Sequence, residues 1–292
     1  MFRGLYRRAC PNCGGEIDDY RLVLGLPCRR CLPDDELAKK LSSEELSWID
    51  IAETLSKFST LKDAKYLAEI EKDINDLESV FEKCVGRRFW SIQRLWARRL
   101  LSSQSFAMIA PTGIGKTTFG LIAAIWLAWR KGKKSYIIVP TTTLVKQYED
   151  KLEEYQKKLG LILNVVALYS RLSLKKRKER EESISQGVAD IVITTSAYLR
   201  RKFELLKNMD FHMIFVDDVD AVMKGSKVVE LLLRLMGFNE EDLKKARKIL
   251  NLKRELSSIR ESEKIDKKLK EIKKIKNELI MKRRGKVLIP IF

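Results

Sequence analysis

The sequence predicts an α/β protein in which a mostly parallel sheet is covered by helices on both faces. Three observations lead to this prediction. Short apolar runs alternate with helical stretches over residues 106–238, which is the rhythm of consecutive β-α-β units. Hydrophobic residues make up 45% of the chain, enough for a packed core. The length of 292 residues fits two domains of about 150 residues each.

The net charge indicates a class of partner. Lys and Arg total 58 against 40 Asp and Glu, a formal charge of +18. This excess favours a polyanion such as nucleic acid, although basic side chains can also simply solvate a surface. The longest apolar run, Phe119–Trp129, is shorter than the ~18 residues of a membrane span, and no apolar segment follows the basic N-terminus. We therefore expect a cytoplasmic protein with no membrane partner.

Four of the five cysteines lie near the N-terminus as two C-x-x-C pairs, Cys10/Cys13 and Cys28/Cys31. This spacing is typical of a zinc ribbon, because each hairpin presents two thiolates and two hairpins complete a tetrahedron. Disulfides are the alternative, but nothing marks the chain as secreted. The sequence therefore predicts a zinc ribbon over residues 1–35 with these four Zn²⁺ ligands.

A helical linker is expected over residues 36–86. Acidic residues near its start mark a helix N-terminus, and apolar residues follow at helical spacing until Gly86. The segment holds no obvious chemistry. The fifth cysteine, Cys84, is interpreted as a small buried residue.

Strands of the sheet are expected within residues 87–238, where short apolar runs end at turn residues. These runs are Phe106–Ala110, Ser135–Pro140, Asn164–Tyr169, Asp190–Thr195 and Met213–Val216.

The first of these strands leads directly into a phosphate-binding sequence and then into a helix. Glycines let backbone N–H groups converge on a phosphate, and the helix N-terminus adds a favourable dipole. Lys116 is expected to reach the β- and γ-phosphates of ATP, and Thr117 to bind Mg²⁺. The predicted nucleotide-binding residues of this loop are Pro111, Thr112, Gly113, Ile114, Gly115, Lys116, Thr117 and Thr118.

An acidic sequence, Asp217-Asp218-Val-Asp220, follows the last predicted strand. Asp217 is expected to hold Mg²⁺, and Asp218 to orient or deprotonate the attacking water. Together with Lys116 they are the predicted catalytic residues. The alternative is that the aspartates only cap the next helix. The phosphate-binding loop roughly a hundred residues upstream favours the catalytic interpretation, while the role of Asp220 stays open.

These motifs together resemble the first RecA-like domain of superfamily-two helicases, whose usual acidic sequence is Asp-Glu-x-Asp. Asp218 in place of that Glu, the continuation Thr-Thr-Phe-Gly120 and the four-cysteine module are similar to the N-terminal, helicase-like half of reverse gyrases. Those enzymes are ATP-dependent topoisomerases that introduce positive supercoils. The resemblance covers essentially the whole chain. It implies a RecA-like P-loop NTPase domain over residues 87–238, with ATP, Mg²⁺ and Zn²⁺ as cofactors and DNA held mainly by its backbone.

The resemblance also adds site residues. Gln93 is similar to the adenine-reading glutamine of these helicases, and an ordinary exposed helix glutamine is the alternative. Residues 140–144 and 194–196 resemble the family's nucleic-acid-contacting loops, where hydroxyls and helix N-termini suit phosphate oxygens. Plain helix caps are the alternative there. The basic residues expected along a DNA track are Lys146, Arg171, Lys175, Lys176, Arg177, Arg200 and Arg201.

The C-terminal part is strongly basic. Residues 240–286 hold 18 Lys or Arg against 9 Asp or Glu. A break in the helical spacing between Ile259 and Ile265 predicts a helical hairpin over residues 239–285, in the position of the family's latch. Residues 286–292 are interpreted as the start of a strand that is cut short. We therefore expect the second RecA-like domain and the topoisomerase part to be missing, through a truncated, split or partial sequence.

Two functions are compatible with these observations. One is the N-terminal part of reverse gyrase, which binds ATP, Mg²⁺ and DNA to drive positive supercoiling with a type IA topoisomerase half. Alone it would be weakly active or inactive, because a missing arginine finger can be worth ~10³-fold or more. The other is a basic, zinc-containing DNA-binding protein with a vestigial nucleotide site. The zinc ribbon is either a structural clamp or presents Arg7, Arg8, Arg29 and Arg30 to DNA.

Overall fold

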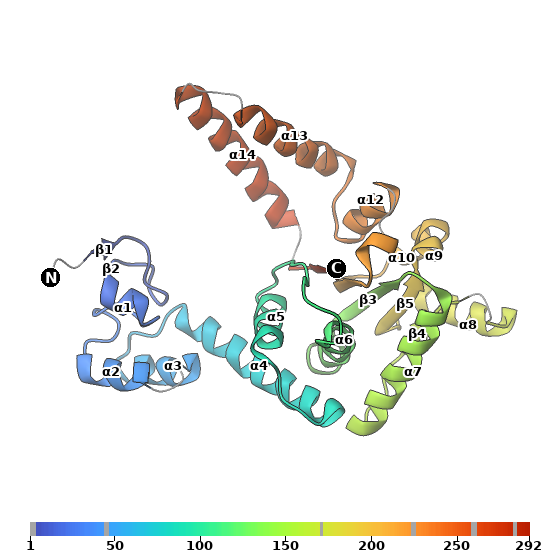
Figure 1. Cartoon of the computed structure of the whole chain (residues 1–292), viewed down its shortest axis with the longest axis horizontal. Coiled ribbons are helices and arrows are strands. Elements are labelled where there is room, and N and C mark those ends of the chain that lie inside the picture. Colours follow the sequence, from blue (N-terminus) through green and yellow to red (C-terminus); the bar gives the residue numbers. More distant parts are fainter. Residues whose placement is uncertain (1–3, 44–46, 170–171, 223–225, 258–261, 283–284) are drawn as a thin grey trace. The chain divides into compact units, whose positions relative to one another are not determined.

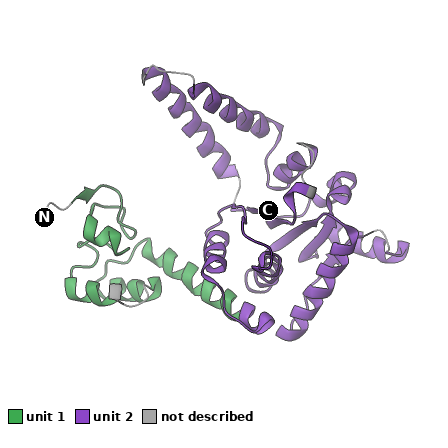
Figure 2. Cartoon of the chain, viewed as in Figure 1, with its two compact units in different colours: residues 1–79 green, residues 80–292 purple. Residues whose placement is uncertain are grey.

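The computed structural model describes residues 4–43, 47–169, 172–222, 226–257, 262–282 and 285–292. The chain forms two compact units, residues 1–79 and residues 80–292 (Figure 2). Each unit has its own core. Within the described residues, no helix is long and apolar enough to cross a membrane.

The first unit begins with the cysteine-rich segment (Figure 1). A short antiparallel pair, β1 (Leu5–Tyr6) and β2 (Ile17–Asp18), is followed by four helices. These are α1 (Asp19–Val23), α2 (Asp35–Ser43), α3 (Trp48–Lys57) and α4 (Ala64–Val85), the last of which continues into the second unit.

One apolar core joins the cysteines to the helices that follow them. Cys10, Cys28 and Cys31 pack in the same cluster as Ile51 and Leu55 of α3. The fully buried Asn12 links the two parts of the chain: its amide donates to the Thr60 carbonyl at 2.8 Å and accepts from the Lys62 N–H at 2.8 Å. The helices therefore supply apolar surface that a segment of about 35 residues could not bury alone.

The second unit is built on a five-stranded sheet in which every neighbouring pair is parallel. The strand order is β4-β5-β3-β6-β7. The predicted parallel α/β fold is therefore confirmed. The strands are β3 (Lys134–Val139), β4 (Val165–Ala167), β5 (Ile191–Thr195), β6 (Phe211–Val216) and β7 (Val287–Pro290).

The predicted strand Phe106–Ala110 is not a regular strand. The segment runs beside β7, with the Phe106 and Met108 N–H groups donating to the carbonyls of Leu288 and Pro290 at 3.2 and 2.9 Å. Only Met108 forms a bridge, to Ile291. The reason is chemical: Pro290 has no N–H to return a bond to the Phe106 carbonyl, so the ladder is interrupted there.

Helices cover both faces of the sheet. On one face, Tyr136, Ile138 and Ile214 pack against helices α8, α9, α10 and α12. On the other, α6 and α7 contact β3. The helices of this unit up to α12 are α5 (Ser91–Leu101), α6 (Lys116–Lys131), α7 (Thr142–Leu159), α8 (Leu174–Ser185), α9 (Ser196–Arg201), α10 (Phe203–Leu206), α11 (Val219–Val222) and α12 (Ser226–Leu235).

The predicted helical hairpin is present as α13 (Glu240–Leu256) and α14 (Ser262–Lys282), which lie side by side in Figure 1. The predicted break begins at Ile259, which lies outside the described residues. Asn239 caps α13 in a reciprocal pair with Asp242. A small core around Leu252, Ile272 and Ile275 joins the two helices. Ion pairs cross between them, Lys245–Glu278 at 3.1 Å and Lys248–Glu271 at 2.6 Å.

A glycine sets how closely α6 approaches the sheet. A Cβ atom at Gly120 would lie 2.2 Å from ring carbons of Phe215, a fully buried residue of β6. We expect Gly120→Ala to lower the free energy of unfolding by about 1–3 kcal/mol, because the ring must move within a packed core. Chemical denaturation would measure the loss. Adding Phe215→Leu should recover part of it; strictly additive effects of the two substitutions would contradict this explanation.

Candidate functional site

The phosphate-binding loop has the backbone that its glycines predict. Gly113 and Gly115 have φ angles of +85° and +87°, in the left-handed region that side-chain-bearing residues rarely adopt. Gly115 is the N-cap of α6, so the loop ends at a helix N-terminus with unpaired N–H groups. This is the local geometry that binds an anion.

The side chain of Lys116 lies over this loop. Its ammonium donates to the carbonyl of Ala110. This acceptor is a neutral peptide carbonyl. A phosphate would supply a stronger, charge-assisted acceptor at the same place.

A pocket of about 420 Å³ joins the loop to the acidic sequence. Asp217 and Asp218 follow β6, and their backbone turns sharply, with Asp218 at a φ of +53°. Aspartate adopts this region more readily than most side-chain-bearing residues, so the angle marks a tight turn directly after β6. The pocket is lined by Thr112, Gly113, Gly115, Lys116, Thr117, Thr118, Asp217, Asp218, Ile291 and Phe292. Of the residues predicted from the loop, Pro111 and Ile114 are outside this lining among the described residues.

Gln93 is buried, with 1% of its surface exposed, so it is not an ordinary exposed helix glutamine. Its Oε1 accepts from the Trp90 N–H at 3.0 Å, and its Nε2 donates to the carbonyl of Ile114 at 3.1 Å. Gln93 therefore joins the start of α5 to the phosphate-binding loop. Its contact with adenine stays a prediction.

Among the described residues, a tyrosine that no sequence pattern predicts also reaches this site. Tyr148 of α7 donates to Oδ2 of Asp217, and its hydroxyl lies 3.4 Å from Oγ1 of Thr117. Burial and the neighbouring Asp217 raise the pKa of Tyr148, so its hydroxyl stays protonated at neutral pH. Tyrosine at a helical position is usually a core residue, so only the folded chain reveals this contact.

The oxygen donors of the pocket fit Mg²⁺. Thr117 and Asp217 present a hydroxyl and a carboxylate, which are hard ligands, and open space remains for phosphate oxygens and water. Thr117 and Asp217 are the residues that would hold the ion.

The four cysteines of the first unit converge as predicted. Their Sγ atoms all lie within 4.8 Å of one another. The Sγ atom of Cys28 is 3.7 Å from those of Cys13 and Cys31. A Zn²⁺ tetrahedron with Zn–S bonds of about 2.3 Å has S–S edges of about 3.8 Å, so the spacing fits the ion. The four thiols therefore form a cluster with the donor set of a structural zinc site.

The environment of the cluster favours thiolate at one position. Burial acts to raise the pKa of Cys10, but hydrogen bonds from the N–H groups of Cys28, Cys13 and Asn12 outweigh it and lower this pKa to about 7. Cys84, by contrast, is buried away from the cluster, and burial raises its pKa to about 11. This agrees with its interpretation as a small core residue.

Two of the four arginines beside the cysteine pairs are engaged in ion pairs. Arg29 binds Asp18 at 3.2 Å and also binds Asp35, and Arg7 lies 3.4 Å from Glu16. Arg8 and Arg30 are exposed. The buried Arg21, absent from the prediction, pairs with Asp35 and so fixes α2 to the cysteine module.

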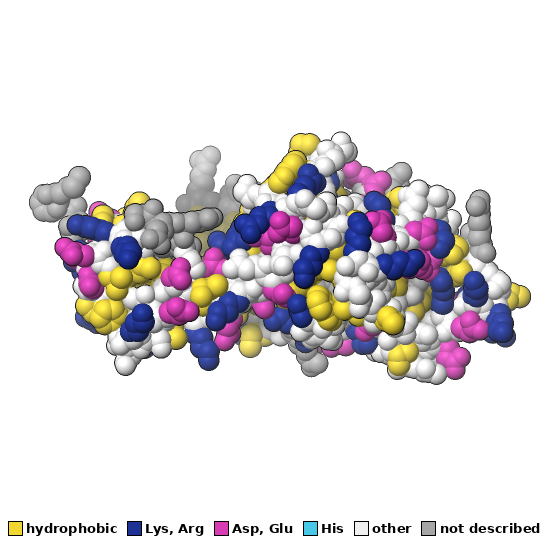
Figure 3. Space-filling model, turned by 90° about the horizontal axis from the view of Figure 1, so that it is seen from below, with side chains coloured by type: hydrophobic (Ala, Val, Ile, Leu, Met, Phe, Trp, Pro, Cys, Tyr) yellow, Lys and Arg dark blue, Asp and Glu magenta, His cyan; other side chains and the backbone are white. Residues whose placement is uncertain are grey.

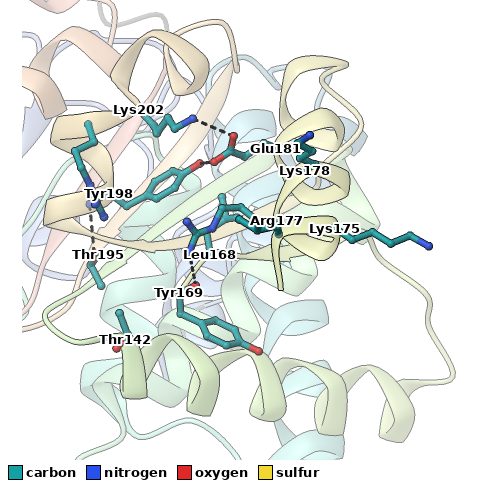
Figure 4. A pocket seen from close by; sticks show the side chains of 12 residues that line it. Thr142, Leu168, Tyr169, Lys175, Arg177, Lys178, Glu181, Thr195, Tyr198 and Lys202 are labelled. Atoms are coloured by element: carbon teal, nitrogen blue, oxygen red, sulfur yellow. Dashed lines mark hydrogen bonds and ion pairs between the residues drawn. The ribbon is translucent and has the colours of Figure 1, made fainter. Parts of the chain in front are cut away.

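A second, larger pocket of about 840 Å³ brings together the two predicted DNA loops (Figure 4). Thr142 comes from the N-terminus of α7 and Thr195 from the end of β5. Helix α8 supplies the basic wall. The pocket is lined by Thr142, Leu168, Tyr169, Leu174, Lys175, Arg177, Lys178, Glu181, Thr195, Tyr198, Arg201 and Lys202.

The acidic residue of this pocket is already neutralised. Glu181 accepts from the Tyr198 hydroxyl at 3.0 Å and pairs with Lys202 at 3.0 Å. Arg177 donates to the carbonyl of Tyr169 at 3.4 Å. The remaining Lys175, Lys178 and Arg201 leave the pocket with a positive balance.

The other basic residues predicted to contact DNA are absent from the described lining of this pocket. Lys146 is paired with Asp150 at 2.7 Å and with Glu149 at 3.2 Å. Lys176 and Arg200 lie outside the described lining, and Arg171 lies outside the described residues. Figure 3 shows Lys and Arg side chains spread over one face with Asp and Glu between them, so the charge of this face is mixed in sign.

Comparison with known proteins identifies the families of both parts. Residues 1–47 match the model of the reverse gyrase zinc finger. Residues 90–252, more than half of the chain, match that of the DEAD/DEAH box helicases. The chain belongs to the DEAD/DEAH box helicase family. Its resemblance to reverse gyrase, and the zinc-finger character of the cysteine module, are confirmed as well.

Full-length relatives agree with these matches. The chain is 41% identical to "Reverse gyrase 1" of Aeropyrum pernix over 93% of this chain and 20% of that protein. It is 42% identical to the reverse gyrase of Pyrococcus horikoshii over 88% of this chain and 16% of that protein. The chain thus spans about a fifth of the length of its first relatives. The yeast DEAD-box splicing factor Prp28 superposes with a TM-score of 0.44 at 23% identity, over 56% of this chain and 40% of Prp28.

Proposed function

We propose that this chain is the ATP- and DNA-binding N-terminal part of a reverse gyrase. It binds ATP with Mg²⁺ in the second unit, and it binds DNA mainly by contacts to the sugar-phosphate backbone of the DNA. The energy of nucleotide binding and hydrolysis drives positive supercoiling together with a second RecA-like domain and a type IA topoisomerase part. The zinc finger match and the reverse gyrase relatives support this assignment.

The observation that carries the nucleotide half of the proposal is the convergence of Lys116, Thr117 and Asp217 on one pocket. Lys116 would neutralise the phosphates of the nucleotide, and Thr117 and Asp217 would hold the Mg²⁺ ion that offsets their charge. Asp218, exposed at the rim, orients or deprotonates the attacking water. Rapid turnover is expected to need charge-stabilising groups from a second RecA-like domain.

The larger pocket, called the basic pocket from here on, supports the proposal that the chain binds DNA. The hydroxyls of Thr142 and Thr195 and the charges of Lys175, Lys178 and Arg201 suit the phosphates of a strand without reading its sequence. Such binding is strongly dependent on salt.

The test is DNA-stimulated ATP turnover at high temperature, by this chain alone and with the rest of a reverse gyrase supplied separately. Turnover that appears on complementation supports the proposal. Absence of turnover in every mixture, with DNA binding intact, would replace it with the alternative of a zinc-containing DNA-binding protein whose nucleotide site is vestigial.

The basic pocket makes a separate prediction. Lys175→Ala combined with Lys178→Ala should weaken DNA binding and reduce the slope of log affinity against log salt concentration by about 1–2, because each lost phosphate contact lowers it by about 1. Fluorescence anisotropy at several salt concentrations would measure both. The matched control is Lys151→Ala with Lys157→Ala, two exposed lysines of α7 outside the pocket lining. Equal effects of the two pairs would mean that only net charge matters.

A further inference from the structure

The Tyr148 hydroxyl lies between the two side chains that would hold Mg²⁺. It donates to Oδ2 of Asp217 and lies 3.4 Å from Oγ1 of Thr117. The residue comes from α7, which belongs to neither the phosphate-binding loop nor the acidic sequence. Only 4% of Tyr148 is exposed, so its ring is fixed by packing.

From this arrangement we propose that Tyr148 is a positioning residue for the Mg²⁺ ion of the nucleotide site. The proposal rests on the proposed function, since it concerns the same pocket. Tyr148 contacts neither nucleotide nor ion; it acts through Thr117 and Asp217.

The hydrogen-bonding capacity of each group explains the role. The phenol has one proton, which it donates to Oδ2, so Oδ1 of Asp217 is left to face the ion or its water. The phenol oxygen can then accept the Thr117 hydroxyl proton, which turns a lone pair of Oγ1 toward the pocket. One buried hydroxyl thus orients both ligands, as groups behind metal ligands commonly do.

Tyr148 and Asp217 are also held together in the absence of the ion. Asp217 is anchored through its backbone, whose N–H donates to the Ile138 carbonyl at 2.9 Å. Its side chain depends on Tyr148 for the hydrogen bond to Oδ2. Without that bond the carboxylate has other rotamers to populate, and binding of the ion must overcome their entropy.

The test is Tyr148→Phe, which keeps the ring and removes only the oxygen. The affinity for a fluorescent ATP analogue is measured at increasing Mg²⁺ concentrations and also in EDTA. We expect the affinity in EDTA to stay within about twofold of wild type, and the Mg²⁺ concentration for half-maximal enhancement to rise about 10-fold. The control is Tyr136→Phe, which removes another buried hydroxyl, bonded to Thr194 at 2.6 Å, away from the pocket lining. It should leave the Mg²⁺ dependence unchanged.

The outcomes distinguish failure of the positioning role from failure of the proposed function on which it rests. Nucleotide binding by wild type with an unchanged Mg²⁺ dependence in Tyr148→Phe would overturn the positioning role, even if the unfolding temperature falls. Tighter Mg²⁺ binding in the variant would overturn it too, because the hydroxyl would then compete with the ion. Failure of wild type to bind nucleotide would instead reject the proposed function itself.

Discussion

Replacing Cys28 with serine, or removing zinc with a chelator, is expected to unfold the first unit while leaving the second folded. Cys10, Cys28 and Cys31 are part of the core that holds α2 and α3, so the loss extends beyond the loops. Structural zinc contributes an apparent ~10–16 kcal/mol in small domains, which is comparable with the whole stability of a typical domain. Limited proteolysis within residues 1–79, together with zinc content, measures the effect.

The matched control for this substitution is Cys84→Ser. Cys84 is buried and lies outside the cluster, so the variant should keep its full complement of zinc. Retention of zinc and protease resistance by Cys28→Ser would contradict a four-cysteine site. Loss of nucleotide binding by Cys28→Ser at saturating Mg²⁺ would contradict the independence of the two cores.

The second large effect is expected at the phosphate-binding loop. Lys116→Ala should weaken ATP binding by about 10- to 100-fold, because a hydrogen bond to a charged group contributes roughly 1.5–3 kcal/mol. The unfolding temperature should change little, since the Lys116 side chain lines the pocket and is not part of the apolar core. Calorimetric titration with ATP and Mg²⁺ is the measurement.

Its control is Lys131→Ala, at the opposite end of α6, where the side chain is exposed. This variant has the same change in charge and should bind ATP as wild type does. If both lysines had the same effect on affinity, general electrostatic attraction rather than contact with the phosphates would explain the result.

Much of this architecture can be predicted from the sequence because it depends on local patterns. The spacing of the cysteines predicts that they converge, and they do: these are Cys10, Cys13, Cys28 and Cys31. The strands β3, β5 and β6 consist of buried apolar runs that leave little choice of conformation. The turn geometry at Gly113 follows from the residue type itself.

What the sequence does not predict depends on distant partners. Phe106–Ala110 has the composition of a strand, but its pairing depends on Pro290 in a segment more than 180 residues later. Tyr148 meets Asp217 only because α7 packs beside the end of β6. Gln93 is identified as a candidate by resemblance, while its bond to Ile114 appears only in the folded chain.

Helix α7 has a mechanical consequence. Thr142, at its first turn, lines the basic pocket, and Tyr148, six residues later, touches Asp217. At about 1.5 Å per residue, the two positions are about 9 Å apart along a single helix. A hydrogen-bonded helix is stiff over this length and moves as one element. If bound DNA displaced the first turn of α7, the same helix would therefore displace Tyr148 and, through it, the carboxylate of Asp217.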